Sequence, residues 1–286
     1  MAEINFLSKP TNPIQTLGLG VFDGFHLGHK ALSNNCDALL TFYPHPEFVL
    51  RKDTTLKLLT TIEERKAIFK NMFIIEFTKD FSKLTATQFL EDVIKKEINP
   101  KKIIVGYDFC FGYKREGDLS LLKDWGTKNN IEIETIEPFK HHGVIVKSSH
   151  IRESLKEGRF DEAIANLGHP YLIKGEVVEG ENRGSKIGFP TANVQVDAKK
   201  LVPASGVYEG TVFYQDQKLK AAIYIGKKPT FGNFQKHIEV HILNFNKQIY
   251  GDILSVWLCK KIRSEKKFNS TQDLINQIQK DVKSII

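Results

Sequence analysis

The pattern of the sequence changes near residue 169, and this change constrains the fold more than any other feature. Before it, short apolar runs that resemble strands alternate with helix-like segments such as 61–71 and 86–98. Such alternation predicts a mainly parallel sheet covered by helices. After it, from Tyr171 to Leu258, strand-like runs are separated by turns containing Gly and Pro, which predicts a small antiparallel barrel. We therefore expect an α/β domain over 1–169 and a β domain over 170–286.

Individual elements follow from periodicity and turn residues. The strands expected in the first half are 16–22, 39–43, 73–78, 102–105 and 131–136. The strands expected in the second half include two pairs, 206–214 with 218–226 and 237–246 with 248–258. Segment 151–167 predicts two short helices interrupted near Gly158. The last segment, 271–286, predicts a terminal helix whose apolar stripe packs on the barrel.

Composition narrows the class of protein. No apolar run approaches the roughly 18–20 residues that span a bilayer, and the first residues lack the pattern of a secretory signal. The three cysteines are far apart and form no CxxC pair, which argues against a disulfide framework or a thiolate zinc site. We therefore expect a cytoplasmic protein. Its net charge of +7 would help to recruit anionic substrates such as nucleotides. A weak RNA binder would show the same charge, and solubility alone explains it equally well.

The first chemical motif is segment 20–29, which follows an expected strand and opens a helix. Open parallel sheets bind phosphates at such positions. His26 and His29 are three residues apart and share one face of a helical turn, while Gly28 between them leaves room for a phosphate. Two imidazoles with backbone N–H groups can stabilise the charge of a phosphate undergoing displacement, with no protein nucleophile. The alternative is a helix start with incidental histidines, because an HxxH pair alone is a weak signal.

The second motif is the glycine-spaced loop 180–193. Its glycines allow backbone N–H groups to cradle phosphates. Thr191 and Asn193 alternate with Ala192, so their oxygens point the same way in an extended segment. A hydroxyl and an amide carbonyl are hard donors suited to Mg²⁺. A polar turn of the barrel explains these residues equally well.

The third motif is Glu239, flanked by His237 and His241 on one face of an expected strand. These three side chains could bind a transition metal. However, all the ligands would come from one strand, and no further Cys/His cluster is evident in the sequence. Transfer of phosphate to a primary hydroxyl requires a carboxylate that orients the hydroxyl and accepts its proton. We therefore favour Glu239 as the general base of a kinase, with the histidines in the wall or rim of its site.

Taken whole, segment 20–29 resembles the HxGH nucleotidyltransferase signature of prokaryotic bifunctional riboflavin kinase/FAD synthetase. Further segments resemble motifs of this family in the same order, and together they cover nearly the whole chain: 41–46, 105–112, 148–152 and the GxPTAN motif at 188–193. The resemblance implies a Rossmann-like FMN adenylyltransferase domain followed by a riboflavin kinase barrel with a terminal helix. It implies that ATP phosphorylates riboflavin to FMN and adenylylates FMN to FAD, with Mg²⁺ as cofactor.

The resemblance also implies roles for individual residues. The catalytic residues would be Glu239, His26 and His29. The ATP-binding residues would be Phe22, Asp23, Gly24, Gly28, Ser148, Ser149, Arg152, Gly184, Lys186, Gly188, Pro190, Thr191 and Asn193. The flavin-binding residues would be Pro44, His45, Asp108, Phe109, Tyr208 and Arg263, and the Mg²⁺ ligands Thr191 and Asn193.

Two departures from the family leave alternatives open. Only residues 30–38 separate His29 from the strand expected at Leu39, so the first helix is shorter than usual, and Cys110 stands where the family often has Arg. Both are compatible with a riboflavin kinase whose adenylyltransferase domain is impaired. The pI near 9.1 alone motivates a third reading, a basic RNA-binding or regulatory protein that binds flavin. Against this reading, the basic residues are scattered along the chain.

Overall fold

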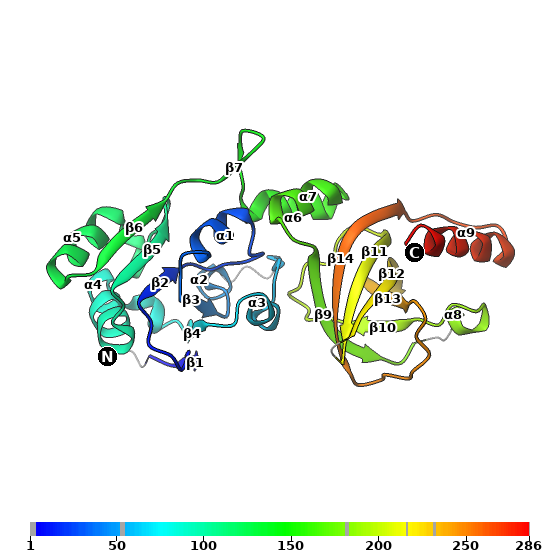
Figure 1. Ribbon diagram of the computed structural model, residues 1–286, viewed down its shortest axis with the longest axis horizontal. Coiled ribbons are helices and arrows are strands. Elements are labelled where there is room, and N and C mark those ends of the chain that lie inside the picture. The colour runs from blue at the N-terminus through cyan, green and yellow to red at the C-terminus, as the bar shows by residue number, and fades with distance from the viewer. Residues whose placement is uncertain (1–3, 52–54, 181–182, 216, 231–232, 286) are drawn as a thin grey trace. The chain divides into compact units, whose positions relative to one another are not determined.

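The computed structural model describes residues 4–51, 55–180, 183–215, 217–230 and 233–285. By its contacts the chain forms two compact units. The sheet unit comprises Met1–Leu56 and Arg65–Lys147, and the barrel unit comprises Lys57–Glu64 and Ser148–Ile286. Each unit contains its own sheet (Figure 1). The boundary at residue 169 stays a prediction.

The sheet unit is built on six strands in the order β1-β4-β3-β2-β5-β6. Their bounds are β1 Phe6–Ser8, β2 Thr16–Leu19, β3 Ala38–Tyr43, β4 Met72–Glu76, β5 Lys102–Gly106 and β6 Glu132–Ile136. Strands β2 to β6 pair in parallel, whereas β1 joins β4 antiparallel. The five strands expected in this half are all present, although β2 ends at Leu19 and β4 at Glu76, short of the expected residues 22 and 78. Because β2 lies between β3 and β5, the strand order reverses at β2, and in open α/β sheets ligands bind at the carboxyl ends of such strands.

Helices and short hairpin strands complete this unit (Figure 1). They are α1 Leu27–Ser33, α2 Pro46–Leu50, α3 Ile62–Ile68, η1 Phe81–Lys83, α4 Ala86–Gln88, η2 Phe89–Ile98, η3 Tyr113–Arg115, α5 Leu119–Asn129, β7 Lys140–His141 and β8 Val144–Ile145. Helix α3 begins with residues of the barrel unit and continues into the sheet unit. The helix expected over 86–98 is confirmed, although η2 has π-helical hydrogen bonding. Its apolar face, including Phe89 and Val93, is buried in the core with the strands.

The barrel unit is a closed antiparallel barrel with the strand order β10-β13-β12-β11-β14-β9, as the sequence predicts. Its strands are β9 Tyr171–Val178, β10 Ala192–Gln195, β11 Gly206–Tyr214, β12 Gln217–Thr230, β13 Asn233–Ile242 and β14 Ile253–Ser264. Its helices are α6 Ser148–Glu157, α7 Phe160–Leu167, α8 Arg183–Lys186 and α9 Thr271–Lys283. The expected break near Gly158 is confirmed, since Gly158 separates α6 from α7 with φ +83°. None of the helices in the described part of the chain is both long and apolar enough to span a bilayer.

The pair expected over 237–246 and 248–258 is wrong. Strand β13 ends at Ile242 and β14 begins only at Ile253, and β14 pairs with β11 and β9 and not with β13. Residues 243–252 form a loop instead. Asn244 and Gly251 have φ values of +56° and +82°, which are incompatible with a continuous extended strand. Leu243 and Ile249 are nevertheless buried, so the apolar pattern of a strand continues through the loop.

The terminal helix α9 is attached to the barrel by an ion pair. Arg263 of β14 donates from Nε to both carboxylate oxygens of Asp281 at 3.1 and 2.9 Å, and its Nη2 lies 2.8 Å from Oδ2. The apolar stripe predicted for this helix ends in Ile285, which is buried. Lys220 Nζ also donates to the Ile285 carbonyl oxygen at 2.8 Å.

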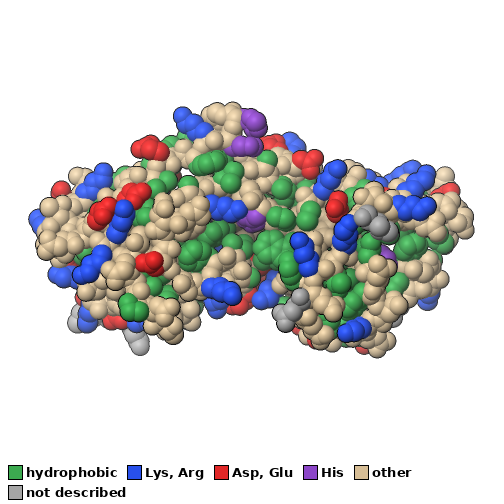
Figure 2. Space-filling model, in the orientation of Figure 1, with side chains coloured by type: hydrophobic (Ala, Val, Ile, Leu, Met, Phe, Trp, Pro, Cys, Tyr) green, Lys and Arg blue, Asp and Glu red, His purple; other side chains and the backbone are tan. Residues whose placement is uncertain are grey.

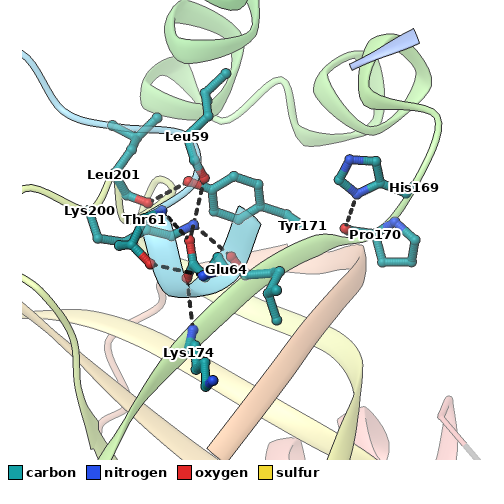
Figure 3. Close-up of polar contacts among 10 residues, drawn as sticks. Leu59, Thr61, Glu64, His169, Pro170, Tyr171, Lys174, Lys200 and Leu201 are labelled. Carbon is teal, nitrogen blue, oxygen red and sulfur yellow. Dashed lines mark hydrogen bonds and ion pairs between the residues drawn. The ribbon is translucent and has the colours of Figure 1, made fainter. Parts of the chain in front are cut away.

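Residues 57–64, which we call the strap, are held in the barrel unit by a buried lysine (Figure 3). Lys200 Nζ lies 2.7 Å from Glu64 Oε2 and donates to the carbonyl oxygens of Leu59 and Leu172, each at 2.6 Å. Glu64 Oε2 accepts from the Thr61 backbone N–H, and Oε1 accepts from that of Lys174. Both charged side chains have no exposed surface. The pair is tolerated in the interior because its hydrogen-bonding groups have partners.

Candidate active sites

The two histidines of the first motif lie face to face at the start of α1. Their ring centroids are 3.7 Å apart and their planes differ by 16°. His26 Nδ1 accepts a hydrogen bond from the His29 backbone N–H at 3.4 Å, so its ring proton is on Nε2. A Cβ atom at position 28 would lie 3.2 Å from His26 Cε1, so Gly28 permits the stacked arrangement. The placement of both histidines on one face is confirmed.

The environment of His29 keeps its imidazole neutral. Burial is the main cause that holds the pKa of His29 well below 6.5, and the charges of His26 and Arg65 lower this pKa further. The Phe22 ring packs edge-on against His29 with a centroid distance of 5.4 Å. Within the described residues His29 Nδ1 is buried and has no hydrogen-bond partner. A neutral ring at this position can donate a hydrogen bond without adding a titrating charge.

The sequence motifs did not identify Arg65, whose side chain is completely buried. Arg65 Nη1 donates to the carbonyl oxygen of Val21 at 2.8 Å and to Thr41 Oγ1 at 3.3 Å. A signal was present in the sequence, since Arg65 occupies the position three after Ile62 and four before Phe69 on the apolar side of α3. A charged residue within an apolar helical stripe indicates a buried polar partner.

In the barrel unit the predicted kinase residues gather on one face of β10 and β13. Asn193 and Glu239 are direct partners in the antiparallel ladder. Thr191 Oγ1 donates to Glu239 Oε2 at 3.3 Å, and His237 Nε2 lies 3.3 Å from Oε1. The other histidine, His241, contacts the Pro190 carbonyl oxygen through Nδ1 at 2.8 Å. No three His, Cys, Asp or Glu side chains of the described residues are grouped as ligands of a metal ion.

A cavity of 530 Å³ opens beside these residues and is lined by Lys186, Pro190 and Thr191. The structure therefore brings three of the predicted ATP-binding residues together. Residues 245–250 also line the cavity, and the sequence does not reveal this part of the lining because its pattern predicts strands there. Two glycines determine the path of the loop that leads to Pro190 and Thr191. A Cβ at Gly184 would lie 2.3 Å from the Phe189 carbonyl oxygen, and Gly188 has φ +88°. Glu181 and Asn182 of the second motif lie outside the described residues.

Comparison with known proteins decides the family. The model of the FAD synthetase family matches residues 8–150, and that of the riboflavin kinase family matches residues 167–286. A bifunctional riboflavin kinase/FMN adenylyltransferase from Buchnera aphidicola subsp. Schizaphis graminum is 35% identical, over 97% of this chain and 95% of its own length. The Bacillus subtilis protein of the same name is 32% identical, over 98% and 94%. The chain belongs to the bifunctional riboflavin kinase/FMN adenylyltransferase family.

A solved structure of nearly the same extent also matches. The crystal structure titled a macrolide-efflux protein from Streptococcus pneumoniae has a TM-score of 0.84 and 30% identity, and the match covers 97% of this chain and 95% of that one. Both units of the family fold are therefore present together in an experimental structure of similar sequence. The two family models and the curated relatives carry the family assignment.

The remaining residues assigned to the FAD synthetase site follow β2, β3 and β5. Phe22 and Asp23 are buried in the turn after β2, where Gly24 has φ +88°. Pro44 follows β3 after a cis peptide bond, and His45 Nδ1 accepts from the Glu47 backbone N–H and caps α2. Asp108 and Phe109 follow β5, where Asp108 is exposed and Phe109 stacks on Phe111. These positions adjoin the switch in strand order, although their ligand roles stay predictions.

Ser148, Ser149 and Arg152 belong to α6, which is part of the barrel unit. Arg152 Nε donates to the carbonyl oxygen of Lys57 in the strap at 3.0 Å. The assignment of these three residues to ATP binding stays a prediction of the family resemblance.

Two residues assigned to the flavin site of the kinase have structural partners. Tyr208 is completely buried, its hydroxyl donates to the Ala204 carbonyl oxygen at 2.5 Å, and its ring meets that of Phe160 edge-on. Burial raises the pKa of this phenol well above 10, so the hydroxyl is a permanent donor. Arg263 is engaged by Asp281 of α9. Their flavin-binding roles stay predictions.

Proposed function

We propose that the barrel unit of this chain phosphorylates riboflavin with ATP and that the sheet unit transfers AMP from ATP to the resulting FMN. The observation that carries the proposal is that both units retain an assembled group of reactive residues. In the barrel, Thr191 lines a 530 Å³ cavity and donates to Glu239, which pairs with Asn193 across β10 and β13. In the sheet unit, His26 and His29 stack at the start of α1.

For phosphorylation, Glu239 acts as the general base. Its carboxylate accepts the proton of the primary hydroxyl of riboflavin, the hydroxyl oxygen attacks the γ-phosphorus of ATP, and ADP leaves. The hydrogen bond from Thr191 at 3.3 Å orients this carboxylate. Thr191 and Asn193 supply a hydroxyl and an amide oxygen, hard donors that fit Mg²⁺, and the two would hold it. When bound, Mg²⁺ supplies positive charge that neutralises the phosphate oxygens.

For adenylyl transfer, a phosphate oxygen of FMN attacks the α-phosphorus of ATP, the bond to the β-phosphate breaks, and pyrophosphate leaves. No protein nucleophile is required, because the attacking oxygen already carries negative charge. His26 donates from Nε2, since its Nδ1 is occupied as the acceptor from His29 N–H. Stabilisation of the charge by fixed donors is the main contribution of the protein.

The test uses two variants of the full chain with opposite effects. Glu239→Gln should abolish formation of FMN from riboflavin while FMN is still converted to FAD. His26→Ala combined with His29→Ala should abolish formation of FAD while riboflavin is still phosphorylated. The products are separated by chromatography after incubation with ATP and Mg²⁺. If either variant reduces both reactions equally, the assignment of one reaction to each unit is wrong.

A riboflavin kinase with an impaired adenylyltransferase remains the second candidate, because α1 has only seven residues and Cys110 is exposed where the family often has Arg. Conversion of FMN to FAD by the unmodified chain decides between the two. We place the enzyme in the cytoplasm, and its three free cysteines fit a reducing compartment. Lys and Arg side chains are spread over the visible face instead of forming one patch (Figure 2), which favours small-molecule substrates over nucleic acid.

A further inference from the structure

The buried guanidinium of Arg65 braces the chain at the point where β2 ends. Arg65 Nη1 donates to the Val21 carbonyl oxygen at 2.8 Å and to Thr41 Oγ1 at 3.3 Å, and Thr41 Oγ1 donates to the same carbonyl at 2.9 Å. Val21 directly precedes the turn that leads to the histidines, and Thr41 belongs to the neighbouring strand β3. Burial of a charged group is costly unless such hydrogen bonds compensate for it.

The turn that Arg65 braces has an unfavourable backbone. Phe22 and Phe25 have φ values of +55° and +47°, in the left-handed region that non-glycine residues rarely adopt. Such conformations persist only where the surroundings hold them. Phe69, the residue directly after α3, makes a second contact to the same turn. Its ring stacks on that of Phe25 with a centroid distance of 5.9 Å. Residues at the end of α3 and just beyond it therefore hold both ends of the turn.

The charge of Arg65 also acts on the histidine pair. Burial is the main cause that lowers the pKa of His29, and the charges of His26 and Arg65 lower it further. Arginine does not lose its proton in proteins. Arg65 therefore places a permanent positive charge near the two imidazoles, and at least one of these imidazoles is neutral.

We propose that Arg65 is a positioning residue for adenylyl transfer, which fixes the turn from Val21 to Phe25 and thereby the orientation of His26 and His29. The inference rests on the proposed adenylyltransferase activity of the sheet unit. Arg65 acts through the backbone and the histidines, because its own side chain has no exposed surface with which to touch a substrate.

The test compares Arg65→Met, Arg65→Lys and Thr41→Val in the full chain. Arg65→Met should lower kcat for FAD formation by about 10–100-fold, the size of effect that a misplacement of 1 Å produces, with little change in KM for FMN or ATP. It should also move the acid limb of the pH profile to higher pH, because His29 is protonated more easily without the cation. Arg65→Lys and Thr41→Val should lower kcat less and leave this limb in place, because both retain the charge.

Riboflavin phosphorylation serves as the internal control, and Arg51→Met, a matched substitution at an exposed arginine, should leave both reactions unchanged. An Arg65→Met enzyme that forms FAD at nearly the unmodified rate with an unmoved acid limb overturns the proposal. So does one whose two activities fall in parallel. If the unmodified chain forms no FAD, the proposed function itself fails. The NMR titration of His29 then tests Arg65 independently, because its midpoint should rise in Arg65→Met and stay in place in Arg51→Met.

Discussion

At the level of single residues, the absence of a side chain at Gly28 leaves room for the stacked rings of His26 and His29. A Cβ here would approach His26 Cε1 and Nδ1 to 3.2 and 3.3 Å, so the imidazole would have to move. Alanine is the better helix former by about 1 kcal/mol, so we expect Gly28→Ala to leave the stability of the sheet unit unchanged or raised. We expect kcat for FAD formation to fall about tenfold or more, because the stack is displaced. Steady-state kinetics and urea unfolding followed by Trp125 fluorescence check this, and full activity would contradict it.

His29 makes stability depend on pH. Its pKa is held well below 6.5 in the folded chain, mainly by burial, and returns to about 6.5 on unfolding. Below pH 6.5 the unfolded state therefore binds a proton that the folded state does not. The free energy of unfolding should fall as the pH drops below 6.5, by up to about 1.4 kcal/mol per pH unit, and be unaffected by His29 above it.

Measurement of this effect uses the two tryptophans, one in each unit. In a Trp257→Phe background only Trp125 reports, and it is buried in the sheet unit. Urea unfolding at pH 7.5 and 5.5 is compared with and without His29→Asn. The loss of stability at pH 5.5 should be smaller in the His29→Asn protein. Equal losses would show that other groups cause the whole dependence.

At the level of elements, the sequence predicts structure wherever burial and local periodicity agree. The apolar face of 86–98 defines a helix because Phe89, Leu90, Val93 and Ile94 are all buried. The start of β14 could not be predicted in the same way, since Leu243 and Ile249 are buried in a loop and imitate a strand. The motif residues His26, His29, Thr191 and Asn193 were predictable because each motif is contiguous. Arg65 and the loop 245–250 were not, because tertiary packing gives them their roles.

The ion pair between Glu64 and Lys200 joins the strap to the barrel through side chains that no local pattern connects. Removal of one partner leaves a buried charge and should cost about 3–5 kcal/mol, whereas removal of both should cost clearly less than the sum of the single changes. We expect this from Lys200→Met, Glu64→Gln and their combination. Trp257 fluorescence in a Trp125→Phe background reports unfolding of the barrel unit. Additive losses would mean that the two side chains do not stabilise one another.

At the level of the whole molecule, the two compact units are not two consecutive stretches of the chain. The strap lies between segments of the sheet unit, yet its backbone pairs with the barrel unit, where Leu58 N–H donates to the Lys199 carbonyl oxygen and Leu201 N–H to that of Leu58. Residues 57–64 precede the boundary expected at residue 169, so the order of the sequence places them in the first domain. A division of the chain by sequence order alone therefore removes part of the interior of the barrel unit.

A fragment comprising residues 148–286 tests this consequence, because it keeps every other part of the barrel unit and lacks only the strap. In the full chain Lys200→Met should cost about 3–5 kcal/mol, since Glu64 stays buried without its partner. In the fragment the Lys200 ammonium meets water instead of Glu64, so the same substitution should cost less than about 1 kcal/mol. Urea unfolding followed by Trp257 gives both differences. If the substitution costs the same in both proteins, the strap is not what makes Lys200 important, and the barrel is complete without residues 57–64.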